Sequence, residues 1–354
     1  MVVSIFIAFI AFLTWLLTIF ASKNPETVES MYSSTIYPYI AKFLSAFNGF
    51  VPISLAEILL FVLLLFLVLL LLKPKLFFNK KTQFFHFLVR TISLLYIGFY
   101  LLWGFNYYRL DYIEIANMNT EPATMQELEE LTVQTIRKIN LVRQGLQEDS
   151  NGVFVLKDSF GELSKKAQKA FYKEDNDLLF PINGHAKPIF LSQWMSFTGI
   201  MGIYIPYTFE PNINTDIPPQ NLPSTIIHEM AHQRGFAKEE EANFIAYKVS
   251  TNHSDPIFQY SGYYLAMQYL MEEMHKLDES SYKIIYSTIS DAVKRDMEYS
   301  RNYWKAKEGK AEELAHKLND NYLKANNQTQ GILSYNGVVK LLLSDFKDTS
   351  SNSN

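Results

Sequence analysis

The sequence predicts a mostly α-helical protein with a small β element, in which membrane helices precede a larger water-soluble domain. The first hundred or so of its 354 residues are dominated by leucine, phenylalanine, isoleucine and valine. Most of the remaining chain has apolar residues at helical spacing, with charged residues between them. Residues 181–219 differ, because they combine proline, glycine and asparagine with β-forming residues and few charges. The β element is expected there.

Three apolar runs are long enough to cross the hydrocarbon core of a bilayer, which takes about 20 residues in a helix. They are residues 2–21, 53–72 and 87–106, the second with Glu57 near one end and the third with Arg90 near its start. A cleaved signal peptide is the competing interpretation of the first run. It is weaker, because no Lys or Arg precedes the run and the run is too long.

The connections between these runs predict the orientation of the chain, because loops rich in lysine stay in the cytoplasm. The first connection, residues 24–51, holds a single lysine, Lys42. The second connection holds four lysines: Lys73, Lys75, Lys80 and Lys81. The first connection and everything after Tyr108 are therefore expected outside the cytoplasm. Trp103, Tyr107 and Tyr108 would then lie at the outer interface of the membrane, where amphipathic rings are favoured.

The predicted organisation is a membrane anchor over residues 1–107, a soluble domain over 108–347 and a disordered tail over 348–354, which is rich in serine and asparagine. A strand is expected at 200–206, where Pro206 ends a run of β-forming residues. The expected helical segments of the domain are 121–145, 163–172, 223–274, 281–317 and 338–343.

The composition excludes several kinds of site. The formal net charge is −4, whereas proteins that bind nucleic acid usually carry a clustered basic face, so no nucleic-acid partner is expected. The chain has no cysteine, which excludes disulfides, thiolate zinc sites and a cysteine nucleophile. Any metal ion must therefore be held by histidine, aspartate or glutamate.

The motif H-E-x-x-H at residues 228–232 predicts a metal site. Pro223 suits the first turn of a helix and Gly235 suits the residue just past its end, so the motif falls on a predicted helix. On such a helix His228 and His232 lie one above the other, and together they can bind one Zn²⁺ ion.

Glu229 is the expected catalytic residue of this motif. Zinc lowers the pKa of a water molecule from about 15.7 to near 7. Glu229 lies beside the histidines, where it can take the proton and later give it to the leaving amine. The alternative is a pair of structural histidines on an ordinary helix. We favour the metal site, because a chain with only seven histidines rarely contains this motif by chance.

A catalytic zinc site needs a third protein ligand. The metzincin pattern would supply it from position 238, but Lys238 cannot bind a metal while it is charged. Three glutamates follow, at the start of a helix whose buried stripe is Ala242, Ile245, Ala246 and Val249. Helical geometry puts Glu239 nearest that stripe, Glu241 slightly further away, and Glu240 nearly opposite, in solvent. We expect Glu239 as the third ligand, Glu241 as the alternative, and Asn243 as a hydrogen-bond partner of a ligand imidazole.

The pairing of H-E-x-x-H with E-x-x-A-N at residues 239–243 is similar to the gluzincin-type zinc peptidases, including the membrane CAAX-processing peptidases. The glutamate that opens E-x-x-A-[DN] is the third ligand in that group, which implies the same role for Glu239 and a zincin-like fold for the domain. A strand beside the metal-binding helix pairs with the substrate backbone in those enzymes. Residues 198–204 are the candidate here, with an ordinary core strand as the alternative.

Six further stretches carry a second resemblance. They are W-G-F-N-Y-Y-R at 103–109, T-G-I-M-G-I-Y-I-P at 198–206, H-E-M-A-H-Q-R-G-F at 228–236, E-E-E-A-N-F-I-A-Y at 239–247, Y-S-G-Y at 260–263 and N-D-N-Y-L-K at 319–324. Through them nearly the whole chain resembles a bacterial membrane-protein family catalogued only as a domain of unknown function. The resemblance implies a multi-pass protein of the bacterial inner (cytoplasmic) membrane with a presumed zinc site.

Two sets of polar residues near the motif have less specific roles. One set is expected in a solvated loop ahead of the motif: Glu210, Asn212 and Asn214. The other set offers possible donors to a transition-state oxyanion: Arg234, His253, Tyr260 and Tyr263.

The expected function is that of a membrane-anchored zinc metallopeptidase, whose partners are the lipid bilayer and a protein or peptide substrate. The alternative is a non-catalytic, zinc-stabilised interaction or assembly protein. Glu229 favours catalysis, because a structural zinc site has no use for a base at that position. A transporter is disfavoured, because the three spans carry only Glu57 and Arg90 as charged residues.

Overall fold

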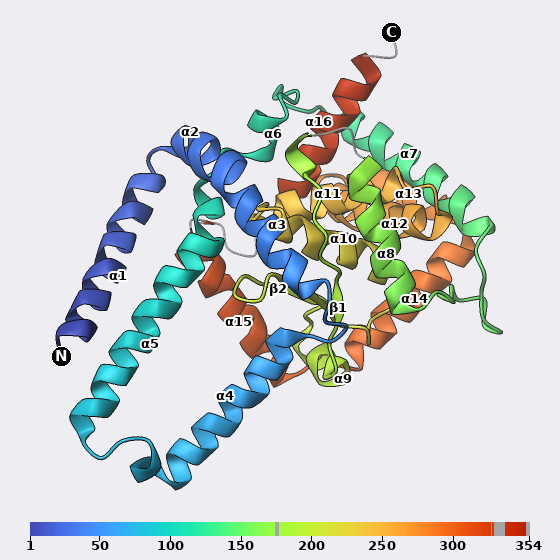
Figure 1. Ribbon diagram of the computed structural model, residues 1–354. Coiled ribbons are helices and arrows are strands. Elements are labelled where there is room, and N and C mark those ends of the chain that lie inside the picture. The colour runs from blue at the N-terminus through green and yellow to red at the C-terminus, as the bar shows by residue number, and fades with distance from the viewer. Residues whose placement is uncertain (174–176, 327, 329–336, 352–354) are drawn as a thin grey trace.

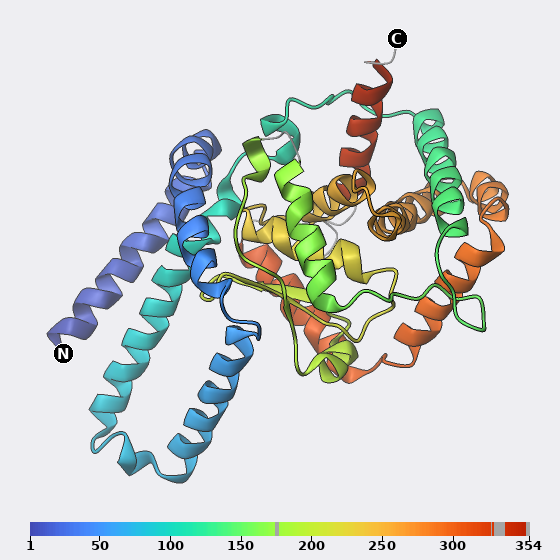
Figure 2. The same cartoon turned by 45° about the vertical axis from the view of Figure 1, so that its right-hand side comes forward.

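The computed structural model describes residues 1–173, 177–326, 328 and 337–351. A helical domain forms the larger part of the molecule, and three long helices project from it (Figures 1 and 2). The N-terminus lies at the free end of one of these helices, whereas the C-terminus lies on the far side of the domain (Figure 1). The predicted class, mostly α with a small β element, is confirmed.

The projecting helices are α1 (Val2–Ala21), α4 (Leu55–Leu72) and α5 (Lys81–Leu102). All three are long and apolar enough to cross a membrane, which indicates that the protein associates with one. Helices α1 and α5 lie side by side, whereas α4 stands apart from them (Figures 1 and 2). None of the residues of α4, all of which the structure describes, is buried.

Helix α5 is displaced along the chain from the expected span at 87–106. It begins earlier because the side chain of Gln83 accepts hydrogen bonds from the backbone amides of Asn79 and Lys80. This polar first turn is helical without being apolar, so hydropathy does not register it. The helix ends earlier because the chain passes at Trp103 into a short 3₁₀ helix, η3 (Gly104–Tyr108).

The connection between the first two spans is helical and packs on the domain. It contains α2 (Pro25–Thr27), the π-helix η1 (Val28–Ile36) and α3 (Tyr37–Asn48). Tyr37 and Ala41 are completely buried, on the face of α3 that meets the domain. The connection is therefore a structural part of the domain's surface layer.

The core of the domain is formed by helices whose apolar residues recur at helical spacing, as the sequence indicated. It contains aliphatic residues such as Ile226, Ile245 and Leu270, all completely buried. We call this cluster the domain core. The helices that build it are α7 (Met125–Gln144), α8 (Phe160–Lys173), α10 (Leu222–Gln233), α11 (Glu239–Thr251), α12 (Pro256–Leu277) and α16 (Gly337–Ser351).

Other elements connect these helices or cover them. They are η2 (Pro74–Leu76), α6 (Tyr112–Ile115), η4 (Asp177–Leu179), α9 (Ser192–Met195), η5 (Ser196–Thr198), α13 (Glu279–Ser287), α14 (Asp291–Lys305) and α15 (Lys310–Ala325).

The prediction of a disordered tail at 348–354 is wrong for its first part, because α16 continues to Ser351. The carboxylate of Asp348 accepts a hydrogen bond from the backbone amide of Asn119 at 3.3 Å. Serine and threonine hydroxyls in this last turn also bond to carbonyl oxygens one turn earlier, so their polarity does not prevent the helix. Residues 352–354 lie outside the described part of the chain.

A small sheet contains β1 (Lys187–Pro188), β2 (Gly202–Ile205) and β3 (Glu210–Ile213) in the order β1-β3-β2. Strand β3 pairs with β1 in parallel and with β2 in antiparallel orientation. The expected strand at 200–206 is therefore confirmed as β2, and it is an edge strand of the described sheet. Both β2 and β3 lie against α10.

The expectation of a solvated loop at Glu210, Asn212 and Asn214 is wrong, because all three side chains are buried. The carboxylate of Glu210 accepts hydrogen bonds at 3.2 and 3.0 Å from two backbone amides in the first turn of α4. Asn212 accepts one from the hydroxyl of Ser54 at 2.6 Å. Glu210 and Asn212 therefore cap a projecting helix and fix it to the sheet.

Trp103, Tyr107 and Tyr108 are buried against the domain, which folds over the end of α5. Their expected depth at the outer interface of the membrane stays a prediction. The three residues belong to a second, mainly aromatic cluster, which we call the junction core. Its buried members are Ala21, Val28, Tyr37, Ala41, Tyr100, Trp103, Tyr107, Tyr108, Ile182, Tyr204, Phe209 and Ala237.

Candidate metal centre

Helix α10 presents the two histidines of the motif on one face. Pro223 occupies its first turn, where a missing backbone N–H has no cost. His228 and His232 are one turn apart, and their ring centroids are 4.6 Å apart at right angles. This is the arrangement that the sequence predicted for a shared metal ion.

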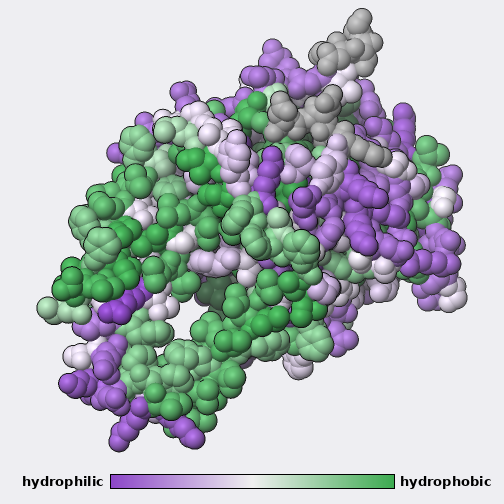
Figure 3. All heavy atoms as spheres, viewed as in Figure 1, coloured by the Kyte–Doolittle hydropathy of each residue, from purple (hydrophilic) through white to green (hydrophobic). Residues whose placement is uncertain are grey.

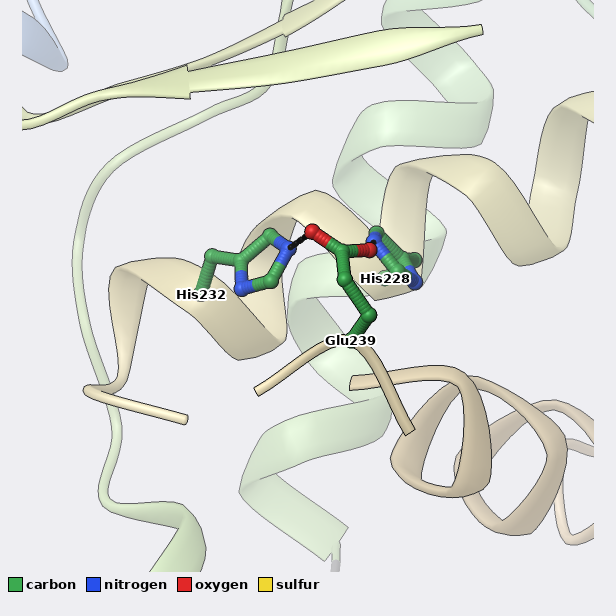
Figure 4. A group of neighbouring side chains, drawn as sticks. All are labelled: His228, His232 and Glu239. Carbon is green, nitrogen blue, oxygen red and sulfur yellow. Dashed lines mark ion pairs between the residues drawn. The ribbon is translucent and has the colours of Figure 1, made fainter. Parts of the chain in front are cut away.

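A tight turn then brings Glu239 back to the histidines. Gly235 has a φ of +86°, and a Cβ atom there would come within 2.9 Å of the Tyr37 ring, so the turn requires glycine. Glu239 opens α11, and its carboxylate lies 3.4 Å from Nε2 of His228 and 3.6 Å from Nε2 of His232 (Figure 4). One ligand atom from each of the three residues lies within 4.8 Å of the others.

The other ring nitrogen of each histidine is held by the protein. Nδ1 of His228 lies 3.0 Å from Oδ1 of Asn243, as the sequence predicted. Nδ1 of His232 lies 2.7 Å from the backbone carbonyl oxygen of Phe236. Since both of these partners are acceptors, each Nδ1 acts as a donor, and each Nε2 is the ring nitrogen that faces Glu239.

Burial lowers the pKa of His232 to about 4, so this imidazole stays neutral, as a metal ligand must be. Burial acts in the same direction on His228, but the hydrogen-bonded carboxylate of Glu239 outweighs it and raises the pKa of His228.

Glu229 belongs to α10, and its side chain lies against the edge strand β2. Burial raises its pKa to about 8, although the nearby His228 opposes the shift. A Cβ atom at Gly202 would come within 2.6 Å of Oε1 of Glu229, so only glycine lets the strand approach this closely. The backbone amide of Tyr204 donates to the carboxylate, while Oε2 has no hydrogen-bond partner among the described residues.

The other two glutamates of α11 point elsewhere. Glu241 is buried and accepts a hydrogen bond from the backbone amide of Tyr112 at 2.8 Å, so it is not part of the cluster. The expectation that Glu240 is solvated is wrong, because it is half-buried and accepts a hydrogen bond from Gln328 at 3.1 Å. Burial raises the pKa of Glu240 to about 7.

The end of α10 is held by side chains from outside the domain core. Three side chains donate hydrogen bonds to backbone carbonyl oxygens there, two in the last turn of α10 and one at Gly235, just past the helix. The pairs are Tyr37 Oη with Gln233 at 2.8 Å, Trp103 Nε1 with His232 at 2.8 Å and Arg109 Nη1 with Gly235 at 3.1 Å. The membrane-proximal segments therefore satisfy carbonyl groups that a helix end leaves without partners.

Most of the side chains proposed as oxyanion donors are engaged elsewhere. Arg234 donates to the carbonyl oxygens of Phe180 and Met230. His253 stacks on Phe258, and Tyr260 donates to Asp296. Tyr263 faces the amine of Lys138 at 5.7 Å from its ring centroid. None of the four makes a described contact with the three clustered residues.

The structure instead brings three tyrosines close to Glu239 that the sequence did not single out as site residues: Tyr107, Tyr269 and Tyr322. Burial is the main cause that raises the pKa of each tyrosine, and the negative charge of Glu239 adds to it. The hydroxyl of Tyr107 donates to that of Tyr322 at 3.1 Å. Tyr107 and Tyr322 lie in two of the stretches that resemble the membrane-protein family, at 103–109 and 319–324. That resemblance was the only sequence signal that could have marked them as site residues.

The donor set fits a zinc ion. Two imidazole nitrogens and one carboxylate oxygen are the ligands of many catalytic zinc sites, which keep a fourth position open. Here the two Nε2 atoms face the Glu239 carboxylate, so one ligand atom of each residue can reach the same ion. His228, His232 and Glu239 are the residues that could hold the ion, and Glu229 lies beside them without contributing a ligand atom.

Comparison with known proteins gives a family but no function. The profile of one protein family matches residues 32–343, which is most of the chain. No curated protein and no solved structure matches the chain. The matched region contains the metal-site residues, the junction core from Tyr37 onward and two of the three projecting helices. The chain therefore belongs to the family described as Protein of unknown function (DUF3810).

Proposed function

We propose that the protein is a membrane-anchored zinc metallopeptidase, which hydrolyses peptide bonds in a protein or peptide substrate. One observation carries the proposal. Glu229 is a buried carboxylate with a raised pKa, held beside His228, His232 and Glu239 without being one of the clustered ligands. A structural zinc site would gain nothing from this group, whereas hydrolysis needs a base there.

The proposed chemistry assigns a separate task to each residue. His228, His232 and Glu239 hold the metal, and a zinc ion bound there supplies a Lewis acid that acidifies water and polarises a carbonyl group. Glu229 accepts a proton from the water as its oxygen forms a bond to the peptide carbonyl carbon. It then gives this proton to the peptide nitrogen as the carbon–nitrogen bond breaks.

Strand β2 supports the proposal as a binding site for an extended peptide. It is an edge strand of the described sheet, so its free side can pair with another strand. Gly202 packs on Glu229, which means that a peptide along this strand would pass directly beside the base. The arrangement is that expected of a zincin-like domain.

The proposal includes the cellular setting that the sequence predicts. The four lysines between the end of α4 and the first residue of α5, Lys81, favour the cytoplasmic side for that connection. The domain, and the connection between α1 and α4 that packs on it, then lie outside the cytoplasm. In a bacterium this corresponds to the outer side of the inner membrane.

Zinc content and activity of point variants test the mechanism on the full-length protein in detergent micelles. His228→Ala, His232→Ala and Glu239→Ala should lose the zinc ion, measured by elemental analysis, because each removes a ligand. Glu229→Gln should keep about one zinc ion per chain and lose peptidase activity by a factor of at least about 100, as expected for removal of a general base.

Glu241→Gln is the matched control, because it changes a buried glutamate of the same helix and keeps an acceptor for the amide of Tyr112. It should retain both zinc and activity. Activity is measured on a fluorogenic peptide library and by comparing membrane and exported proteins of cells with wild-type or Glu229→Gln protein. Full zinc retention in both histidine variants, or full activity of Glu229→Gln, would refute the proposal. Zinc binding with no cleavage product would instead favour the zinc-stabilised assembly protein.

A further inference from the structure

The side of the domain that adjoins α4 and α5 exposes large apolar side chains. Figure 3 shows hydrophobic residues continuing from the projecting helices onto the adjoining part of the domain, whereas the opposite side is mainly hydrophilic. Phe190 is 85% exposed and Trp194 is 74% exposed. We call the set the apolar rim, and its members are Phe190, Trp194, Ile203, Tyr207, Leu314 and Leu318.

Hydrogen bonds fix one part of the apolar rim to the domain-side end of α4. The backbone amides of Phe190 and Leu191 donate to the carboxylate of Glu57 at 2.7 and 3.0 Å. Glu57 lies in the first turn of α4. Trp194 follows in α9, so its exposed ring belongs to a segment that touches the point where this helix meets the domain.

Other contacts place part of the apolar rim beside α5 at a greater depth. The hydroxyl of Tyr207 donates to the carbonyl oxygen of Leu95 at 2.9 Å, and its ring lies on Gly98. Leu95 is seven residues before Leu102, the last residue of α5, which corresponds to about 10 Å along a helix. The whole helix spans about 33 Å, close to the thickness of the hydrocarbon core. The turn between β2 and β3 therefore lies below the domain-side end of the span.

Helix α15 has the pattern of a helix that lies in a membrane interface. Leu314 and Leu318 are exposed and lie four residues apart, on one face of the helix. Three exposed lysines at intervals of seven form a neighbouring stripe on the helix: Lys310, Lys317 and Lys324. Apolar side chains beside lysines of this kind enter the boundary between headgroups and acyl chains. The ring of Tyr322 also contacts Phe99 of α5, at 6.3 Å between centroids.

We propose that the apolar rim is immersed in the lipid leaflet nearest the domain, and that the domain therefore rests in the membrane surface. Lipid is the occupant that these contacts favour, because the rim is continuous with helices that are themselves long and apolar enough to span the bilayer. Ile203 belongs to β2, whose Gly202 covers Glu229. If the protein is the proposed peptidase, on which this consequence rests, it would cleave membrane-attached substrates beside the lipid surface.

Spin labels attached to single cysteines test the immersion without any assay of activity. The chain has no cysteine of its own, so each engineered cysteine takes one label. Trp194→Cys and Leu318→Cys report on the apolar rim. Leu65→Cys, in the middle of α4, is the control for lipid. Leu141→Cys is the control for water, because this residue is 71% exposed on α7, away from the projecting helices (Figure 1).

The full-length protein is reconstituted in vesicles of phosphatidylethanolamine and phosphatidylglycerol. Collision of the label with oxygen, which concentrates in lipid, is compared with collision with a water-soluble nickel chelate. Both rim labels should resemble Leu65→Cys and differ from Leu141→Cys, with the ratio of the two collision rates several-fold higher than at Leu141. Rim labels that behave like Leu141→Cys overturn the proposal. Rim labels shielded from both reagents, and released when the protein is diluted with lipid, also overturn it in favour of a second copy of the chain.

Discussion

Helix α10 lies between two hydrophobic clusters of different composition. The domain core contacts it through aliphatic residues, methionine and some aromatic residues from α8, α11 and α12. The junction core contacts it mainly through tyrosine, tryptophan and phenylalanine, which come from the membrane-proximal segments and the sheet. On the domain-core side, hydrogen bonds reach the start and the middle of α10, where the amide of Ser224 donates to the hydroxyl of Ser261 and the ring of His228 bonds to Asn243. On the junction-core side, Tyr37 and Trp103 donate to the last carbonyl oxygens of α10.

This difference indicates how the anchor and the candidate site are connected. The histidine at the end of α10, His232, has its backbone carbonyl bonded to Trp103 and its ring bonded to Phe236. The position of a proposed metal ligand therefore depends on the membrane-proximal segment as well as on the domain. We expect the domain core to determine stability, and the junction core to determine stability and the geometry of the site together.

The largest effect is expected at the ion pair between Arg109 and Glu29, which joins the junction core to the segment before α3. Both nitrogen–oxygen distances are 2.8 Å, and both side chains are nearly buried. Glu29→Ala should lower the free energy of unfolding by about 3 to 5 kcal/mol, because it leaves a buried guanidinium without its counter-ion. Chemical denaturation in detergent, followed by near-UV circular dichroism, measures this change.

The matched control is Glu279→Ala, which removes the carboxylate of an exposed pair with Lys283. Exposed pairs of this kind contribute at most about 1 kcal/mol, so this variant should unfold close to the wild type. Equal effects of the two substitutions would mean that the connection before α3 is not a structural part of the domain.

The next effect concerns the domain core alone. Leu270→Ala should lower the free energy of unfolding by about 2 to 5 kcal/mol, because Leu270 is completely buried and the substitution leaves a cavity. Zinc content at low temperature should stay at the wild-type value, since Leu270 belongs to the domain core and contributes no ligand atom. Leu277→Ala on the same helix is the control, because Leu277 is 62% exposed and its loss should change stability little. Loss of zinc from folded Leu270→Ala protein would contradict the separation of the two cores.

The two cores also differ in how far the sequence predicts them. The helices of the domain core follow from apolar spacing, and the same spacing predicts that His228, His232 and Glu239 lie on helix surfaces that face each other. Helical geometry is sufficient there because the three residues lie within a short stretch of the chain. The order of preference among the three glutamates agrees with the cluster that the structure contains.

The junction core was not predictable in the same way. A tryptophan at the end of an apolar span, such as Trp103, has the same sequence signature whether it faces lipid or a packed domain. Glu210 and Asn212 resemble loop residues, because their partners in the first turn of α4 lie more than 150 residues earlier in the chain. Local sequence contains no information about such distant partners. The tyrosines near Glu239 were missed for the same reason, since Tyr322 reaches the site from α15.

The smallest effect, at Trp103, separates the two cores most directly. Trp103→Phe keeps an aromatic ring in the junction core and removes only the indole N–H that donates to the carbonyl of His232 at 2.8 Å. One hydrogen bond of this kind contributes about 0.5 to 1.5 kcal/mol, so the midpoint of unfolding should fall only slightly. The carbonyl also accepts a bond from the amide of Gly235, so it is not left without a partner. We therefore expect the main consequence to be local loosening of the last turn of α10.

Hydrogen exchange measured by mass spectrometry should become about three- to ten-fold faster in a peptide covering this turn, corresponding to the same free energy. Exchange in α7 should stay unchanged. Trp304→Phe, on α14, is the control for replacing a tryptophan and should leave the turn as protected as in the wild type. Faster exchange throughout the domain in Trp103→Phe would show that the junction core only stabilises the fold, whereas faster exchange confined to α10 would show that the membrane-proximal segment holds the metal-binding helix in position.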